Sequence, residues 1–338
     1  MNSMPCPCSP ALPDSCREEL RALAIEAGAV ACGFAEADTL PAEDTARYDR
    51  WIAAGRHAGM AYMERHADLR RDPRTLLEGA RTVMVMAFSY AARQRHPLFA
   101  DYALGTDYHD ALRARADSIA AAMRSRHGGE TRVCVDTAPL RERHWAVRAG
   151  LGFTGLNNQL IIPGFGSKIF LTEILWTVGM TPDAPCTASC LRCGACLRAC
   201  PGKALDADGS ALDARRCLSY LTIEHRGDFP DGAPRPAAGQ RIYGCDICAD
   251  VCPYNSPEAL AAATAATLPE FAMRPAVETL KSTADISALT PDSFATIFRG
   301  SAVRRARLAG LHRNAGASLT EMPDPTVADR TALHKEGY

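Results

Sequence analysis

Hydrophobic residues between positions 16 and 182 follow two alternating patterns. Apolar residues spaced three and four apart, the period of an amphipathic helix, predict helices over residues 16–28, 42–54, 108–126 and 141–150. Short, nearly continuous apolar runs predict strands over residues 30–34, 82–90, 132–136, 159–163 and 168–178. The run 82–90 is bounded by polar residues and is typical of a central strand. Because helices and strands alternate, this region is predicted to form a mixed α and β domain around one sheet.

The pattern changes on either side of this domain. Residues 1–15 contain four prolines and no periodic pattern, so we expect a disordered tail, with Ser15 as the N-cap of the first helix. Residues 183–256 are dominated by cysteines and include a Gly-, Pro-, Asp- and Arg-rich insertion. Residues 257–338 form a C-terminal segment, in which Thr290 followed by proline is typical of a helix start. The chain therefore divides into a tail, a mixed domain over 16–182, a cysteine domain and a C-terminal segment.

Two cysteine motifs carry the strongest chemical signal. CLRCGACLRACP starts at Cys190 and CDICADVCP starts at Cys245, and a proline follows the last cysteine of each. Three closely spaced thiolates that hold one cluster, with a fourth that ligates another, are typical of bacterial ferredoxins. Together with Cys217, the ligand count closes at two 4Fe-4S clusters. We assign cluster 1 to Cys190, Cys193, Cys196 and Cys252, and cluster 2 to Cys200, Cys217, Cys245 and Cys248.

Structural zinc is the main alternative, because paired CxxC units also suit tetrahedral zinc sites. Two zinc ions would not require the third cysteine of CxxCxxC or the CP ending of both motifs, so clusters are favoured. The remaining cysteines have no ligand spacing. Free thiols indicate a reducing cytosol, and a disulfide framework is disfavoured because 338 residues can bury a large core.

Hydropathy and charge limit where the protein can reside and what it can bind. No apolar run approaches the roughly 20 residues of a membrane helix, so we expect a soluble chain. The net charge of −1 neither favours nor excludes a polyanionic partner. The segment 299–313 carries five arginines and no acidic residue. Such a run suits phosphate binding, but it is equally typical of a solvated helix face.

The candidate chemistry of the first domain lies in TDYH, residues 106–109, and VDTAPLRER, residues 135–143. Glycine-rich nucleotide motifs and the HExxH zinc-protease motif do not occur in the sequence. Asp136 is the last residue of a predicted strand and precedes a proline-containing turn, a place where folds expose catalytic groups. A helix cap or an ion pair with Arg141 or Arg143 is the open alternative for Asp136, and a structural hydrogen bond is the alternative for His109.

These sequence motifs resemble those of a known family. DYH, VDTAPLRER, AGLGFTG, CxxCxxCxxxCP, DARRCLSYLTIE, RIYGCDICADVCP and RGSAVRRARLAGLHRNA resemble, in order and spacing, the motifs of epoxyqueuosine reductases over residues 16–320. The resemblance implies an α+β fold with three parts. These are a mixed α/β cobalamin-binding domain, nitroreductase-like as in reductive dehalogenases, a ferredoxin-like two-cluster domain over 183–256 and a short helical C-terminal segment. It also implies that cobalamin takes electrons from two 4Fe-4S clusters and reduces epoxyqueuosine to queuosine at the wobble position of a tRNA anticodon.

The resemblance also assigns roles to individual residues. Asp136 matches the family's proton donor. To hold a proton near neutral pH its pKa would have to rise from about 4, which desolvation beside the corrin would cause. Cobalamin contacts are expected from Met60, Tyr62, Tyr108, His109, Asp136, Gly152, Asn158, Ser167, Glu173, Ser219, Cys245 and Asp246. Contacts to tRNA are expected from Arg215, Arg216, Thr222, Arg304, Arg305 and Arg307.

Two departures from the family pattern affect the expected contacts. Leu156 stands where the family commonly has Lys, and the chain lacks the helical-repeat extension of some relatives, so we expect a smaller tRNA footprint. A corrinoid reductive dehalogenase acting on small molecules and a non-enzymatic iron-sulfur electron carrier are the alternatives. The lack of a twin-arginine leader and the basic segment 299–313 disfavour the dehalogenase. We further expect an external low-potential electron donor, a cytoplasmic location, a monomer and no membrane contact.

Overall fold

A four-stranded antiparallel sheet forms the centre of the protein, in the order β1-β2-β6-β3. The structure is a computed structural model that describes residues 11–237 and 240–320. The strands are β1 (Ala31–Glu36), β2 (Thr82–Ser89), β6 (Ile169–Trp176) and β3 (Thr131–Cys134). Every residue of β2 is buried, as predicted for a central strand. With helices on both faces of an antiparallel sheet, the fold belongs to the predicted α+β class.

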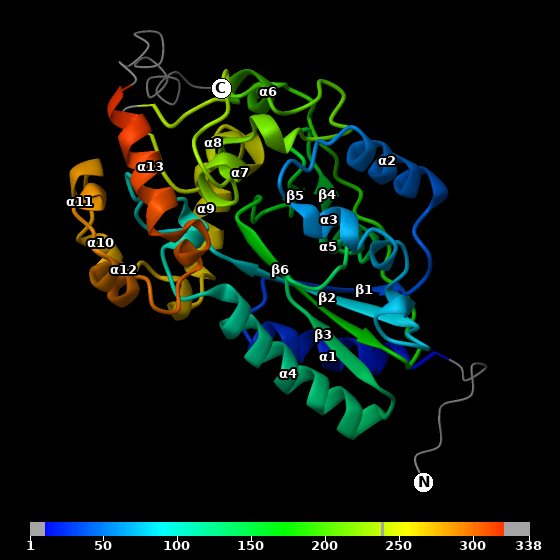
Figure 1. Ribbon diagram of the computed structural model, residues 1–338. Helices are drawn as coiled ribbons and strands as arrows, with labels where there is room; N and C mark the ends of the chain where they lie inside the picture. Colours follow the sequence, from blue (N-terminus) through cyan, green and yellow to red (C-terminus); the bar gives the residue numbers. More distant parts are fainter. Residues whose placement is uncertain (1–10, 238–239, 321–338) are drawn as a thin grey trace.

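Helices cover the two faces of this sheet (Figure 1). They are α1 (Asp14–Glu26) and α4 (Tyr108–His127) on one side, and α2 (Ala42–Ala53), α3 (Ala61–Arg65) and α5 (Glu142–Arg148) on the other. On the first face, Leu20 and Leu112 share a hydrophobic core with Met86 of β2. On the second face, Trp145 packs against Val85 and its neighbours. Side chains of β2 therefore alternate between two cores, as the period-two geometry of a strand requires.

Shorter elements build the rest of the chain. They are β4 (Phe153–Thr154), β5 (Leu160–Ile161), α6 (Ala195–Ala199), α7 (Leu218–Ile223), α8 (Ile247–Asp250), α9 (Pro257–Ala265), α10 (Pro275–Glu278), α11 (Thr283–Ser287), α12 (Pro291–Ile297) and α13 (Arg307–Thr320). Thr290 caps α12 as predicted, because its side chain accepts from the Ser293 N–H. No helix among the described residues is both long and apolar enough to cross a membrane.

The start of the fold differs from the prediction. Helix α1 begins at Asp14 with Pro13 at the N-cap position, so Ser15 lies inside the helix and does not cap it. Leu12 forms a parallel bridge with Met180, and its N–H donates to the carbonyl of Gly179 at 2.9 Å. Residues 11–15, which we assigned to the tail, are therefore attached to the sheet domain. The rest of the predicted tail, residues 1–10, lies outside the described residues.

The C-terminal helices share a hydrophobic core with two earlier parts of the chain. Phe99 from the sheet domain and Tyr243 from the cysteine domain pack with Phe298, Val303 and Leu311. The backbone segments around Phe99 and Tyr243 are also hydrogen-bonded, because Ala100 N–H donates to the carbonyl of Tyr243 at 2.9 Å. The three predicted parts are consequently packed together around one shared core.

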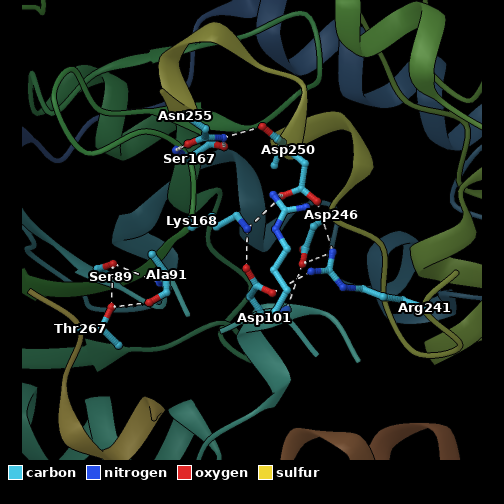
Figure 2. Close-up of polar contacts among 12 residues, drawn as sticks. Ser89, Ala91, Asp101, Ser167, Lys168, Arg241, Asp246, Asp250, Asn255 and Thr267 are labelled. Atoms are coloured by element: carbon cyan, nitrogen blue, oxygen red, sulfur yellow. Dashed lines mark hydrogen bonds and ion pairs between the residues drawn. The ribbon is translucent and has the colours of Figure 1, made fainter. Parts of the chain in front are cut away.

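A buried network of charges joins the sheet domain to the cysteine domain (Figure 2). Lys168, just before β6, pairs with Asp101 and with Asp250, the latter at 3.0 Å. Arg241 pairs with Asp101 and Asp246, both at 2.8 Å, and with Asp250 at 3.4 Å. The side chains of Lys168 and Asp101 are 3% and 2% exposed. Burial alone would lower the pKa of Lys168, but Asp101 and Asp250 raise it, so the lysine stays charged.

We predict that Lys168→Met destabilises the protein by about 3–5 kcal/mol, because it leaves the three carboxylates of Asp101, Asp246 and Asp250 with Arg241 as their one remaining largely buried cation. The midpoint of denaturant unfolding measures this change. Arg71→Met is the matched control: it removes an ion pair to Asp49 in which both side chains are about half exposed. The control should lose at most about 1 kcal/mol. Equal effects of the two substitutions would mean that the network does not stabilise the domain contact.

Candidate functional site

Four of the assigned cysteines line one pocket. Cys190, Cys193 and Cys196 from the first motif and Cys252 from the second surround it, together with residues 155–157 and 253–254. The first motif turns sharply at Arg192 and Gly194, whose φ angles of 51° and 71° are positive. These turns bring the three thiols of the CxxCxxC run to the same side of the chain. The arrangement is the set that we assigned to cluster 1.

The other four cysteines also lie close together. Burial raises the pKa of Cys248, and the neighbouring thiols of Cys245, Cys217 and Cys200 raise it further. These four are the set that we assigned to cluster 2. The described cysteines are all free, and no group of three or more His, Cys, Asp or Glu side chains within 11–237 and 240–320 is arranged for a single metal ion. The side-chain amide of Asn157 donates to the carbonyl of Cys248 at 3.3 Å, which ties the loop before β5 to the second motif.

Asp136 lies at the end of the short segment that follows β3, with a positive φ of 47°. Its Oδ2 accepts from the hydroxyl of Tyr108 at 2.8 Å and contacts Nε2 of His109 at 3.0 Å. The other ring nitrogen of His109 contacts the carboxylate of Asp107 at 2.7 Å. Asp107 is the N-cap of α4, so the cap that starts this helix also orients the imidazole. The sequence motifs DYH and VDTAP are therefore in contact in the folded protein.

The pKa values of this group differ from the expectation. Burial opposes ionisation of Asp136, but hydrogen bonds from His109 and Tyr108 outweigh it, so the pKa of Asp136 is lowered. For His109, burial favours the neutral ring, but Asp107 and Asp136 raise its pKa to about 9. The proton at neutral pH is therefore held by the imidazolium of His109, in contact with an ionised Asp136. The raised pKa that we predicted for Asp136 does not occur in this arrangement.

Two further carboxylates lie behind Asp136. Oε1 of Glu142 accepts from the Asp136 N–H at 2.6 Å. Burial and the charge of Asp136 raise the pKa of Glu142 to about 8. Glu173 on β6 is fully buried, and neither of its carboxylate oxygens has a hydrogen-bond partner among the described residues. Burial raises the pKa of Glu173 well above its usual range, and the nearby carboxyl groups of Glu142 and Asp136 add to the shift, so both glutamates hold protons at neutral pH.

The sequence analysis did not identify Glu142 as a site residue, although it lies in the VDTAPLRER motif. Its spacing of six residues from Asp136 matches neither a helix nor a strand period, so no pattern pairs the two positions. The positive φ at Asp136 folds the chain back and creates the contact. Glu173 reaches the same place because β3 and β6 pair with Cys134 opposite Glu173, two residues before Asp136.

The basic C-terminal segment approaches the same site. Arg305 makes a two-pronged ion pair with Glu224, with both contacts at 2.9 Å. The Arg305 guanidinium also lies 5.9 Å from the ring centre of Tyr62. Burial and the charge of Glu224 raise the pKa of Tyr62 to about 12, and Asp136 contributes to the same shift. Arg305, Tyr62 and Asp136 are therefore within electrostatic range of one another.

Several predicted contacts have structural roles instead. Thr222 is fully buried; its hydroxyl donates to the carbonyl of Leu218 and accepts from the Gly244 N–H, so it cannot contact an RNA on the surface. Gly152 is packed against β5, where a Cβ would lie 2.0 Å from the carbonyl oxygen of Ile161. These positions do not suit the contacts expected from Thr222 to tRNA and from Gly152 to cobalamin.

Three more predicted cofactor contacts are engaged within the protein. Ser167 is buried, and its hydroxyl accepts from the side-chain amide of Asn255 at 2.9 Å (Figure 2). Asp246 belongs to the buried charge network. Asn158 has a φ of 58°, and its carbonyl accepts from Arg143 at 2.7 Å. For these residues the observed partners explain the residue type without a cofactor.

The remaining predicted contacts lie on the surface or beside the cysteines. Met60 and Cys217 pack against the same small core, and Ser219 follows Cys217 by two residues in α7. Arg215 is paired with Asp213, and Arg216 donates to the carbonyl of Gly202 at 2.7 Å. Arg304 and Arg307 are exposed.

Leu156, which replaces the usual lysine of the family, is buried. A Cβ at Gly209 would lie 2.8 Å from the Leu156 side chain, so the leucine packs against the loop that precedes Cys217. The apolar side chain of Leu156 therefore serves packing within the protein.

Two segments of the chain match known families. Residues 70–137 match the family described as epoxyqueuosine reductase QueG, and residues 189–255 match a 4Fe-4S double cluster binding domain. The first segment ends one residue after Asp136, and the second contains both sets of assigned cysteines. The chain therefore carries a double-cluster iron-sulfur domain, and the predicted cluster content is confirmed at that level.

Full-length relatives and solved structures agree with these matches. The chain is 36% identical over 304 residues to epoxyqueuosine reductase of Leadbetterella byssophila, covering 88% of this chain and 96% of the relative. It is 38% identical over 296 residues to that of Gloeobacter violaceus, covering 85% and 90%.

A crystal structure of epoxyqueuosine reductase with a tRNA-Tyr epoxyqueuosine-modified stem loop superposes with a TM-score of 0.78 at 28% identity, covering 96% of this chain and 86% of that one. A Bacillus subtilis structure, described as having its catalytic aspartate loop swung out of the active site, gives 0.77 at 27% identity, with 96% and 87% covered. The dehalogenase and electron-carrier alternatives are not favoured by these relatives. This chain belongs to the epoxyqueuosine reductase family of oxidoreductases.

Proposed function

We propose that this chain reduces epoxyqueuosine to queuosine in the anticodon loop of a tRNA. The observation that carries the proposal is the position of Asp136. Its carboxylate is hydrogen-bonded by Tyr108 and His109, yet 52% of its side chain is exposed. Desolvation by the surrounding protein nevertheless opposes its ionisation, so the carboxylate is partly enclosed and still open to solvent. A substrate base extended from a tRNA loop could reach it there.

The reaction needs two electrons and two protons. Cleavage of both carbon–oxygen bonds of the epoxide leaves an alkene and releases the oxygen as water. Two 4Fe-4S clusters transfer electrons singly, which suits the double-cluster domain to deliver the pair in two steps.

Cobalamin is the cofactor that we propose for the site around Asp136. The half-exposed side chain of Asp136, the stacked rings of Tyr108 and Phe170 with centres 4.2 Å apart, and the partnerless carboxylate of Glu173 fit a large, flat ligand with polar groups. Tyr62, Tyr108 and His109 would hold it. When bound, a reduced corrin cobalt supplies the electron pair for carbon–oxygen cleavage.

The proton donor is the His109–Asp136 pair. The imidazolium of His109 lies 3.0 Å from Oδ2 of Asp136, and its pKa of about 9 keeps it protonated at neutral pH. The proton passes from His109 to the half-exposed carboxylate of Asp136 and from there to the developing alkoxide. Glu142 has a pKa of about 8 and accepts from the Asp136 N–H, so a second proton is held within the same site. The Bacillus subtilis epoxyqueuosine reductase, in which a catalytic aspartate loop is swung out of the active site, supports this role for Asp136.

The tRNA would approach over the basic segment 299–313. Arg304 and Arg307 are exposed, and neither forms an ion pair among the described residues, so both can contact phosphates. Arg305 is paired with Glu224, and its guanidinium lies over the ring of Tyr62. An external low-potential donor, a monomeric state and a cytoplasmic location complete the proposal.

For the clusters, we predict about eight irons and eight acid-labile sulfides per chain after anaerobic reconstitution, because eight thiolates fit two cubanes. Cys217→Ala should remove mainly cluster 2 and leave the paramagnetic signal of reduced cluster 1. Cys186→Ala, which changes a half-buried cysteine outside both sets, should keep the full content. Two zinc ions without sulfide would contradict the assignment.

For catalysis, we predict that Asp136→Asn keeps tRNA and cobalamin binding but lowers single-turnover rates by about 100-fold or more, as expected for a lost general acid. Turnover of the unmodified protein should also fall as the pH rises through about 9, where His109 loses its proton. Asp117→Asn changes an exposed carboxylate on α4 and should leave both measurements unchanged. A folded, cofactor-loaded Asp136→Asn protein with normal turnover would refute the role of Asp136.

For tRNA binding, we predict that Arg304→Ala with Arg307→Ala weakens affinity and lowers the slope of log affinity against log salt by roughly one unit per lost phosphate contact. Turnover of the free nucleoside should change little. Arg50→Ala with Arg113→Ala, both exposed and on other helices, is the matched control for net charge. An unchanged salt slope would mean that segment 299–313 is a solvated face.

A further inference from the structure

Two exposed hydrophobic side chains flank the thiols of cluster 1. The exposed large hydrophobic residues among the described parts of the chain are Ile25, Leu191 and Val251, and Leu191 is 64% exposed. Leu191 directly follows Cys190, and Val251 directly precedes Cys252. Both of these cysteines line the cluster 1 pocket, and Cys193 beside Leu191 is itself exposed. Exposed apolar groups are thus concentrated where cluster 1 lies nearest to solvent.

The surface around these residues is positively charged. Residues 184–205 contain Arg192, Arg198 and Lys203 and no acidic residue. All three side chains are exposed, and each donates to a backbone carbonyl: Arg192 to Asp208 at 3.5 Å, Arg198 to Cys193 at 3.0 Å and Lys203 to Arg198 at 2.6 Å. None of the three is in an ion pair with a carboxylate among the described residues. The exposed carboxylate of Asp208 is within electrostatic range of Arg192 and offsets part of its charge, so Arg198 and Lys203 supply most of the positive charge that is available to a partner.

Cluster 2 has a different position. Its four cysteines, Cys200, Cys217, Cys245 and Cys248, are half-buried, whereas Cys193 of cluster 1 is exposed. Cys217 packs, as Met60 does, against a small hydrophobic core. Cluster 1, which has an exposed ligand flanked by exposed apolar residues, is thus the one that a partner can approach.

We propose that the surface formed by Leu191, Arg192, Arg198, Lys203 and Val251, the docking face, binds an acidic one-electron carrier protein of the flavodoxin or ferredoxin type. The inference rests on the proposed function, which requires two electrons per turnover. In each transfer the carrier is oxidised by one electron and cluster 1 is reduced by one. Two such encounters supply the pair that the epoxide consumes.

The mixed character of the docking face favours a protein over an RNA. An RNA backbone is recognised by cations and hydrogen-bond donors, and it gains little from an exposed leucine and valine. Protein interfaces commonly place an apolar centre within a charged rim, and opposite charge on the partner speeds encounter. In addition, α6 of the docking face lies at the opposite end of the molecule from α1 and α4 (Figure 1).

The test compares Leu191→Glu and Arg198→Glu with Ile25→Glu, an exposed hydrophobic position on α1. Each full-length protein is reconstituted with both clusters, and iron and sulfide are measured first. Cluster bleaching is then followed by stopped flow with reduced flavodoxin, with a reduced acidic ferredoxin and with dithionite. Binding of oxidised flavodoxin is measured by calorimetry at low and high salt, and tRNA affinity is measured in parallel.

We expect both docking-face variants to bind the carrier more weakly and to lower its second-order reduction rate by about tenfold or more. Reduction by dithionite and tRNA affinity should stay unchanged, and Ile25→Glu should behave as the unmodified protein. Carrier rates unaffected by the two variants, or lost tRNA affinity with intact carrier rates, would overturn the proposal. So would failure of both carriers to reduce the unmodified protein. Failure of the proposed function has a different signature, because product would then be absent even with dithionite.

Discussion

Burial of the Lys168–Asp101–Arg241 network is the constraint on which the arrangement of the site depends. Charges in a protein interior are tolerated only when each has an opposite partner in good geometry. Asp246 and Asp250 flank Cys248 in sequence, and both are paired with Arg241. The second cysteine motif can therefore pack against the sheet domain in one position only, where these carboxylates meet their cations. Hydrophobic contacts around Phe99 and Tyr243 add buried area to the contact between the two domains. The ion pairs specify how the two domains are aligned.

The same network sets the charge beside cluster 2. Its buried members are two cations and three carboxylates, and Arg95, which is 59% exposed, contacts Asp250 at 3.1 Å. Burial alone would lower the pKa of Arg241, but Asp246 and Asp101 raise it, as Asp101 and Asp250 do for Lys168. Both cations therefore stay charged across the physiological range of pH. Electrons that enter cluster 2 add negative charge next to a network that is already close to neutral and cannot lose its cations.

Sequence patterns predicted the elements of the fold better than the partners within the site. The helical period of residues 108–126 and the apolar run 82–90 predicted α4 and β2 correctly, because burial of a helix or strand requires apolar residues at regular positions in the sequence. The cysteine spacing assigned four thiols to each cluster, and the fold brings each of these sets together. The contact between Asp136 and Glu142 depends on one positive φ angle, and the roles of Ser167 and Thr222 depend on distant partners. No local pattern encodes such contacts, and motif matching alone assigned those two residues to ligands.

Asp136 illustrates why a residue's role requires its neighbours as well as its position. A lone carboxyl on the floor of a cleft would have a raised pKa, since burial disfavours its charge. Here Tyr108 and His109 stabilise the charged form, and the acidic proton shifts to the imidazole. Two protonated glutamates behind Asp136 limit how much negative charge the site can accumulate. The site can consequently pass protons forward without carrying three charged carboxylates at once, and this follows from the pairing of β3 with β6, which places Glu173 beside the strand that leads to Asp136.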